Sequence, residues 1–163
     1  MNDKQMRELI NDFGIPAIQE LENKKFSILF DDINVNGTDE KGYHCNVNDV
    51  KFCVYDIDKN TPIFTMDFFE TSDRINMIYH DERHIKLELL YVHDKKLRNK
   101  GIATFYIRKL QQYAMDNDFK YIKVCPNPKA NNFKGNEGLS MIELINYYAK
   151  LSTEDMPIKI IEL

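Results

Sequence analysis

The fold is decided by residues 85–104, which read IKLELLYVHDKKLRNKGIAT. Apolar side chains alternate along residues 85–92 and set Leu87, Leu89 and Tyr91 on one face. An alternation with a period of two is typical of a strand that is buried on one side. The pattern therefore predicts a strand over 85–92.

After this strand and a polar turn, a helix is predicted to begin at Gly101 and to run to about residue 117. Its first turn presents unpaired backbone N–H groups and the positive end of the helix dipole, which together bind a diphosphate well. Gly101 lets the backbone approach a phosphate, and Ala103 is nearly as small. Arg98 and Lys100 add positive charge. The loop is thus predicted to hold a pyrophosphate.

The other elements follow from local periodicity. Helical spacing predicts helices over 3–12, 16–24 and 139–151. Strand patterns are found at 26–30, 50–57, 63–69, 75–79, 121–125 and 158–163. The pair Asn36-Gly37 is a hairpin signal, and residues 126–138 are expected to form a loop. A strand–helix–strand order implies a right-handed crossover between parallel strands, so we expect an α+β fold with a mixed, mostly antiparallel sheet flanked by helices.

Composition limits the class of protein. With 163 residues the length favours one domain, 1–163. A net charge of −4 and a pI of about 5.6 argue against a nucleic-acid partner, which needs a basic face. There is no signal-peptide pattern and no apolar run long enough for a bilayer, so no membrane partner is expected. Three cysteines without framework spacing indicate free thiols in a cytoplasmic protein.

The loop and its flanking elements resemble the GNAT superfamily of N-acetyltransferases over residues 85–151. In that family the loop reads Arg/Gln-x-x-Gly-x-Gly/Ala, which Arg98, Gly101 and Ala103 match. The resemblance implies a GNAT-like acyl-CoA N-acyltransferase fold with acetyl-CoA as the co-substrate. It also implies that residues 85–151 form the coenzyme-binding core, and that the N-terminal helices and meander, 1–84, provide the acceptor side.

The resemblance also assigns roles to individual residues. The implied coenzyme contacts are Leu90, Tyr91, Val92, His93, Arg98, Asn99, Lys100, Gly101, Ile102, Ala103, Thr104 and Asn127. The sequence Tyr147-Tyr148-Ala149-Lys150-Leu151 matches a motif of the family's later helix and places Tyr148 at the position of the usual acid. Glu88 holds a strand position where the family sometimes has a glutamate base.

The chemistry explains why a base and an acid are expected. An alkylamine with a pKa of about 10.4 is mostly protonated at pH 7, which costs about 4.6 kcal/mol to reverse. Glu88, directly or through water, would recover part of that cost. Tyr148 would donate a hydrogen bond to the departing thiolate. The acceptor is then a small-molecule or peptide amine.

Two metal-like patterns fail on closer reading, and no metal is expected. Asp32–Gly37 copies half of a calcium loop, but position twelve is Tyr43 instead of a bidentate Glu. His80 and His84 fit no zinc-enzyme motif and fall in a predicted hairpin turn.

Two other functions stay open, a non-catalytic acyl-CoA-binding module and a binding or interaction domain unrelated to coenzyme A. The sequence also leaves open whether the chain forms a homodimer.

Overall fold

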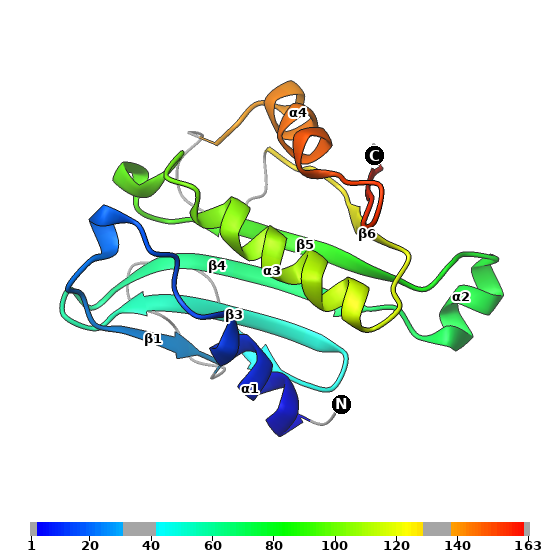
Figure 1. The fold of residues 1–163 in the computed structure, drawn as a ribbon, viewed down its shortest axis with the longest axis horizontal. Helices are drawn as coiled ribbons and strands as arrows, with labels where there is room; N and C mark the ends of the chain where they lie inside the picture. The colour runs from blue at the N-terminus through cyan, green and yellow to red at the C-terminus, as the bar shows by residue number, and fades with distance from the viewer. Residues whose placement is uncertain (1–2, 31–41, 129–137, 162–163) are drawn as a thin grey trace.

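The computed structural model describes residues 3–30, 42–128 and 138–161, which build one seven-stranded sheet with helices against it (Figure 1). The strands are β1 (Phe26–Leu29), β2 (His44–Cys45), β3 (Asp49–Asp56), β4 (Thr61–Glu70), β5 (His84–Val92), β6 (Tyr121–Val124) and β7 (Ile158–Ile160). Their order across the sheet is β1-β3-β4-β5-β6-β7, and β2 pairs with β3.

The sheet is mixed, as predicted. β1, β3, β4 and β5 form an antiparallel meander, whereas β5, β6 and β7 are parallel to one another. The helices are α1 (Asp3–Phe13), α2 (Asp73–Tyr79), α3 (Ile102–Asp116) and α4 (Met141–Leu151), with short 3₁₀ turns η1 (Gln19–Leu21) and η2 (Lys95–Leu97). Because α3 connects the parallel strands β5 and β6, it is the predicted crossover helix.

The main hydrophobic core lies between the sheet and the helices α1 and α3, which both cross the same face of the sheet in Figure 1. Phe64 and Tyr106 stack with ring centroids 4.5 Å apart, and Phe52 meets Tyr106 edge-on at 5.6 Å. Such aromatic pairs contribute about 0.5–1.5 kcal/mol beyond the area that they bury. They tie α3 firmly to the centre of the sheet.

Two predicted elements are wrong. Residues 75–79 form the helix α2 instead of a strand, because Ser72 caps its first turn and His80 ends it in the left-handed conformation. His80 therefore lies at a helix end, not in a hairpin turn. Of the helix predicted over 16–24, only the single turn η1 forms. The Asn36-Gly37 hairpin, the discounted calcium loop and most of the 126–138 loop fall outside the described residues.

No helix in the described part of the chain combines the length and the apolarity needed to cross a bilayer.

Candidate active site

The strand β5 contains a β-bulge at Glu88. In the pairing with β4, Phe68 faces Leu87 and Asp67 faces Leu89, which leaves Glu88 as an extra residue. A bulge reverses the facing of every side chain beyond it. The predicted alternation therefore fails after Leu87.

The reversal is visible in the packing of β5. Ile85 and Leu87 lie in the main core before the bulge, whereas Leu90 and Val92 pack against that core after it. By alternation, Tyr91 is turned to the opposite face of the sheet.

The pairing of β5 with β6 ends where the bulge begins. Parallel pairs run from His84 with Tyr121 to Leu87 with Val124, and β5 then continues alone to Val92. Among the described residues, the backbone of residues 88–92 has no ladder partner on this side. Unpaired N–H and C=O groups along a strand edge can bind an extended chain that carries amide groups. The predicted coenzyme strand thus presents a free edge.

Arg98 holds the loop that follows in place. Its Nε donates to the carbonyl oxygen of Val92 at 3.1 Å, and its Nη2 donates to the hydroxyl of Tyr91 at 2.9 Å. The guanidinium also lies 5.3 Å from the centroid of the Tyr91 ring. These contacts fold the loop back on the end of β5, so Arg98 positions the loop as well as adding charge.

The backbone of the loop opens the N-terminus of α3. Asn99 and Gly101 both have positive φ, 60° and 87°. A Cβ added to Gly101 would meet nothing within 4 Å. The first helical hydrogen bond runs from the N–H of Phe105 to the carbonyl of Gly101, so the N–H groups of residues 102–104 are first-turn donors.

Lys100 beside this loop is already paired. Its Nζ lies 2.6 Å from Oε1 of Glu20, and this contact lowers the pKa of the Glu20 carboxyl. The contact links η1 to the loop. Together, the open helix N-terminus and the nearby cations form a site that suits an anion.

The helix α4 places one of its two tyrosines against this site. A capping box between Ser140 and Glu143 fixes the start of α4. The hydroxyl of Tyr147 lies 3.3 Å from Oγ1 of Thr104, in the first turn of α3. Burial raises the pKa of Tyr147. Its neighbour Tyr148 is 7% exposed and belongs to the hydrophobic core, with its ring edge-on to Tyr147 at 5.4 Å.

The sequence motif contains both tyrosines and assigns the acid to Tyr148 instead of its neighbour Tyr147. The register of Tyr148 came from the family resemblance. Which tyrosine meets the loop depends on how α4 is rotated about its axis, and the sequence does not show this rotation.

Glu88 is accessible at the bulge. Its Oε1 pairs with Nζ of Lys86 at 2.5 Å, and 39% of its side chain is exposed. Asp67, across from the bulge, is more buried. Burial raises the pKa of Asp67 to about 6, and Glu88 adds to the rise while Lys51 opposes it. A second carboxylate therefore lies close to the predicted base.

His93 continues the line of β5 on the sheet face opposite the main core. Its Nε2 lies 2.8 Å from Oγ1 of Thr65, whose hydroxyl is in turn 3.4 Å from the hydroxyl of Tyr43. Burial, with a smaller effect of Arg98, lowers the pKa of His93 to about 4. The imidazole is therefore neutral at physiological pH.

The structure brings most of the predicted coenzyme residues together along β5, η2 and the first turn of α3. Asn127 follows β6, just past the point where β5 and β6 separate, and is exposed.

A cavity of about 500 Å³ lies elsewhere, beside α2, and is lined by Asn76, His80 and Arg83 among others. Since β5 begins near α2 and ends at the loop, this cavity is remote from the loop (Figure 1).

Comparison with known proteins identifies one family. Residues 16–134 match the profile of the Acetyltransferase (GNAT) family. This range includes β5, the loop and α3 but ends before α4. The curated proteins contain no significant match to the chain.

Solved structures with a similar fold share little sequence with the chain. A transcriptional regulator from Bacillus halodurans C-125 is 11% identical with a TM-score of 0.47, and the match covers 67% of this chain and 61% of that one. The aminoglycoside acetyltransferase HMB0005 from an uncultured soil metagenomic sample is 17% identical with a TM-score of 0.46 and the same coverage.

A third structure, the aminoglycoside acetyltransferase meta-AAC0020 from a similar sample, is 14% identical with a TM-score of 0.44. That match covers 93% of this chain and 77% of the other. The chain thus spans 61% of the length of each of the first two relatives.

Proposed function

Because the chain belongs to the GNAT acetyltransferase family, we propose that it transfers the acetyl group of acetyl-CoA to a primary amine by direct attack. The observation that carries the proposal is the coincidence of two features at one place. The pairing of β5 with β6 stops at Leu87, and the open N-terminus of α3 lies beyond the free stretch of β5.

The two features fit two parts of the coenzyme. The amide groups of a pantetheine arm can pair with the free edge of residues 88–92, as in strand addition. The pyrophosphate suits the first-turn N–H groups of residues 102–104, with Gly101 leaving room for close approach. Arg98 supports the coenzyme site through its grip on Val92 and Tyr91.

The reaction of an ammonium substrate removes two protons from nitrogen, one before the attack and one as the tetrahedral intermediate collapses, and adds one proton to the sulfur, so one proton is released overall. The amine nitrogen forms a bond to the acetyl carbon, the C–S bond breaks, and the thiolate accepts a proton. Glu88 is the proposed base, since its exposed carboxylate lies on the bulge of the coenzyme strand. Acting directly or through water, it would remove the proton from the ammonium group.

Tyr148 is the proposed acid, because the match of residues 147–151 to the family motif places it at the position of the usual acid. The contact of Tyr147 with Thr104 favours Tyr147 as a second candidate, because its hydroxyl already faces the first turn of α3. Burial raises the pKa of both phenols, so either one would act mainly by donating a hydrogen bond to the developing thiolate.

The test is binding followed by turnover. Acetyl-CoA should bind to the full chain by calorimetry and raise its melting temperature by mass action. Release of free thiol in the presence of a panel of polyamines, amino acids, aminoglycosides and peptides should then reveal the acceptor. Binding without turnover on any amine would favour a non-catalytic acyl-CoA-binding module. If millimolar acetyl-CoA produces neither heat nor a melting shift, the proposal fails.

A further inference from the structure

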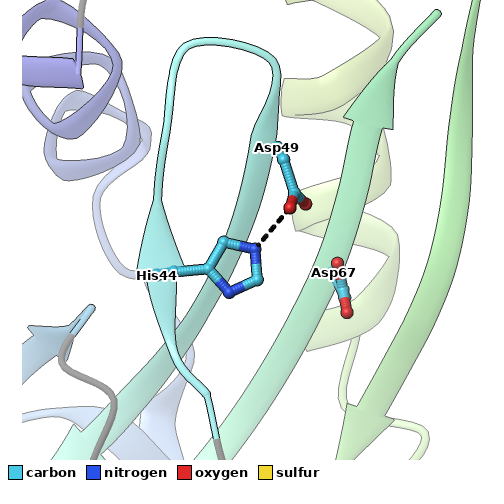
Figure 2. A group of neighbouring side chains, drawn as sticks. All are labelled: His44, Asp49 and Asp67. Atoms are coloured by element: carbon cyan, nitrogen blue, oxygen red, sulfur yellow. Dashed lines mark ion pairs between the residues drawn. The ribbon is translucent and has the colours of Figure 1, made fainter.

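Three side chains that are distant in the sequence meet at the β2–β3–β4 end of the sheet (Figure 2). His44 lies on β2, Asp49 begins β3, and Asp67 lies on β4. One ligand atom from each, an imidazole nitrogen and two carboxylate oxygens, lies within 4.8 Å of the other two. Among the described residues this is the group of three whose chemistry suits a metal ion.

One hydrogen bond fixes which ring nitrogen of His44 is available to a metal ion. Its Nδ1 lies 2.9 Å from the carbonyl oxygen of Gly42, which can only accept, so Nδ1 carries the hydrogen in this contact. When the ring is neutral, its lone pair is therefore on Nε2. Histidines that ligate metals usually donate their other ring nitrogen to a carbonyl or carboxylate in this way.

The Nε2 atom is buried and faces the carboxylate of Asp49 (Figure 2). It lies 2.9 Å from Oδ2 of Asp49, the distance of an ion pair. A metal ion bound between the imidazole and the carboxylates would replace this ion pair, with the lone pair of Nε2 and a carboxylate oxygen of Asp49 both binding the ion.

The charges around the cluster also favour a cation. Asp49 and Asp67 contribute two negative charges as carboxylates, and Lys51, paired across the sheet with both His44 and Asp67, contributes one positive charge. The net charge of this group with a neutral His44 is therefore −1. The neighbouring Lys86 and Glu88 pair with each other and leave this balance unchanged.

We propose that His44, Asp49 and Asp67 form a binding site for a divalent first-row transition metal, with Zn²⁺ as the best-fitting ion. One imidazole with two carboxylates is a mixed nitrogen and oxygen set, which suits zinc and its neighbours better than Ca²⁺ or Mg²⁺. Three protein ligands leave a fourth position of a tetrahedral site for water or another ligand.

The distances require only small movements. Zinc bonds of about 2.0–2.2 Å place tetrahedral ligand atoms about 3.3–3.6 Å apart. Ligand atoms as far apart as 4.8 Å must approach by about 1.2–1.5 Å, whereas Nε2 of His44 and Oδ2 of Asp49, at 2.9 Å, must separate by about 0.4–0.7 Å. Rotation of the carboxylate side chains covers that range without moving the strands.

Metal binding at this site does not require coenzyme binding, although Asp67 lies close to the proposed base Glu88. The site needs neither the α3 loop nor the tyrosines of α4, and it can exist whether or not acetyl-CoA binds. Zinc would connect β2 directly to β4 through Asp67, in addition to the two-residue pairing of β2 with β3.

The experiment is a zinc titration of the metal-free full chain by calorimetry, with the melting temperature measured in parallel. We expect one Zn²⁺ per chain, a rise in melting temperature, and visible absorption bands when Co²⁺ replaces Zn²⁺. His44→Gln and Asp67→Asn should each weaken Zn²⁺ binding by more than about 100-fold, beyond the 10–100-fold cost of losing an outer-shell partner.

Two control variants keep the test specific. His80→Asn removes an exposed histidine outside the cluster and should bind Zn²⁺ like the wild type. Cys125→Ser removes the thiol that is not buried and should also leave binding intact. Circular dichroism of each metal-free variant checks that it folds. The proposal is overturned if the folded wild type binds no Zn²⁺, if His44→Gln and Asp67→Asn bind normally, or if Cys125→Ser alone loses binding.

Discussion

Gly101→Ala tests the coenzyme loop with a single methyl group. Gly101 has φ of 87°, a conformation that costs an L-residue about 1–2 kcal/mol. The added Cβ would meet nothing within 4 Å, so no steric cost is added. For a chain of this size the strain lowers the melting temperature by about 2–8 °C, and the protein should still fold.

The same methyl group would project from the loop where we place the pyrophosphate. We expect the affinity for acetyl-CoA to fall at least tenfold, which is about 1.4 kcal/mol. Gly14→Ala is the matched control, because Gly14 has φ of 70° and a Cβ there is 4.0 Å from the nearest atom, the carbonyl oxygen of Asp12. It should lose similar stability and keep full affinity.

Calorimetry with acetyl-CoA and thermal melting of both variants measure these two effects separately. If Gly101→Ala binds acetyl-CoA as tightly as Gly14→Ala and the wild type do, the open side of Gly101 does not face the pyrophosphate. The proposed coenzyme site would then be wrong. Equal loss of affinity in both variants would instead attribute the effect to reduced stability.

Three further predictions concern the reaction and its pH dependence. Tyr148→Phe and Tyr147→Phe each remove one hydroxyl. The variant that loses the acid should show a kcat lower by a factor of about 10²–10⁴, with little change in KM for acetyl-CoA. Full turnover in both variants would exclude a tyrosine acid. Glu88→Gln should lower turnover most at low pH, where the amine is hardest to deprotonate, and a loss that is uniform across pH would contradict a role as base. Because the pKa of His93 falls from 6.5 to about 4 in the folded chain, the unfolded chain takes up this proton first, so the free energy of unfolding should decrease as the pH falls from 6.5 to 4, by about 3 kcal/mol at most. Denaturant unfolding of the wild type and His93→Asn should show the steeper pH dependence in the wild type, and identical slopes would refute this origin.

Several features followed from the sequence alone. The mixed sheet, the crossover helix and the loop between β5 and α3 were all predicted from local patterns and a family motif. They are local because alternation, helical spacing and a glycine at a helix start act within a few residues. The family match over residues 16–134 confirms the predicted GNAT resemblance and the predicted fold class.

The strand predicted over residues 75–79 is wrong because the residues at the two ends of this segment favour a helix. The apolar residues of α2 suggested a strand, yet Met77 and Tyr79 are 77% and 75% exposed on a helix. β4 and β5 already pair with each other, so the segment that contains α2 only connects two adjacent strands. The cap at Ser72 then favours the helix.

The rest depended on contacts between distant segments. The bulge at Glu88 exists only in the pairing of β5 with β4, and it changes which side chains of β5 face the core. The rotation of α4 decides that Tyr147, rather than Tyr148, reaches Thr104. The cluster of His44, Asp49 and Asp67 appears only when three strands align. The amino-acid sequence determined the elements and their order, whereas the tertiary structure decided which side chains meet, because those meetings depend on strand register and helix rotation.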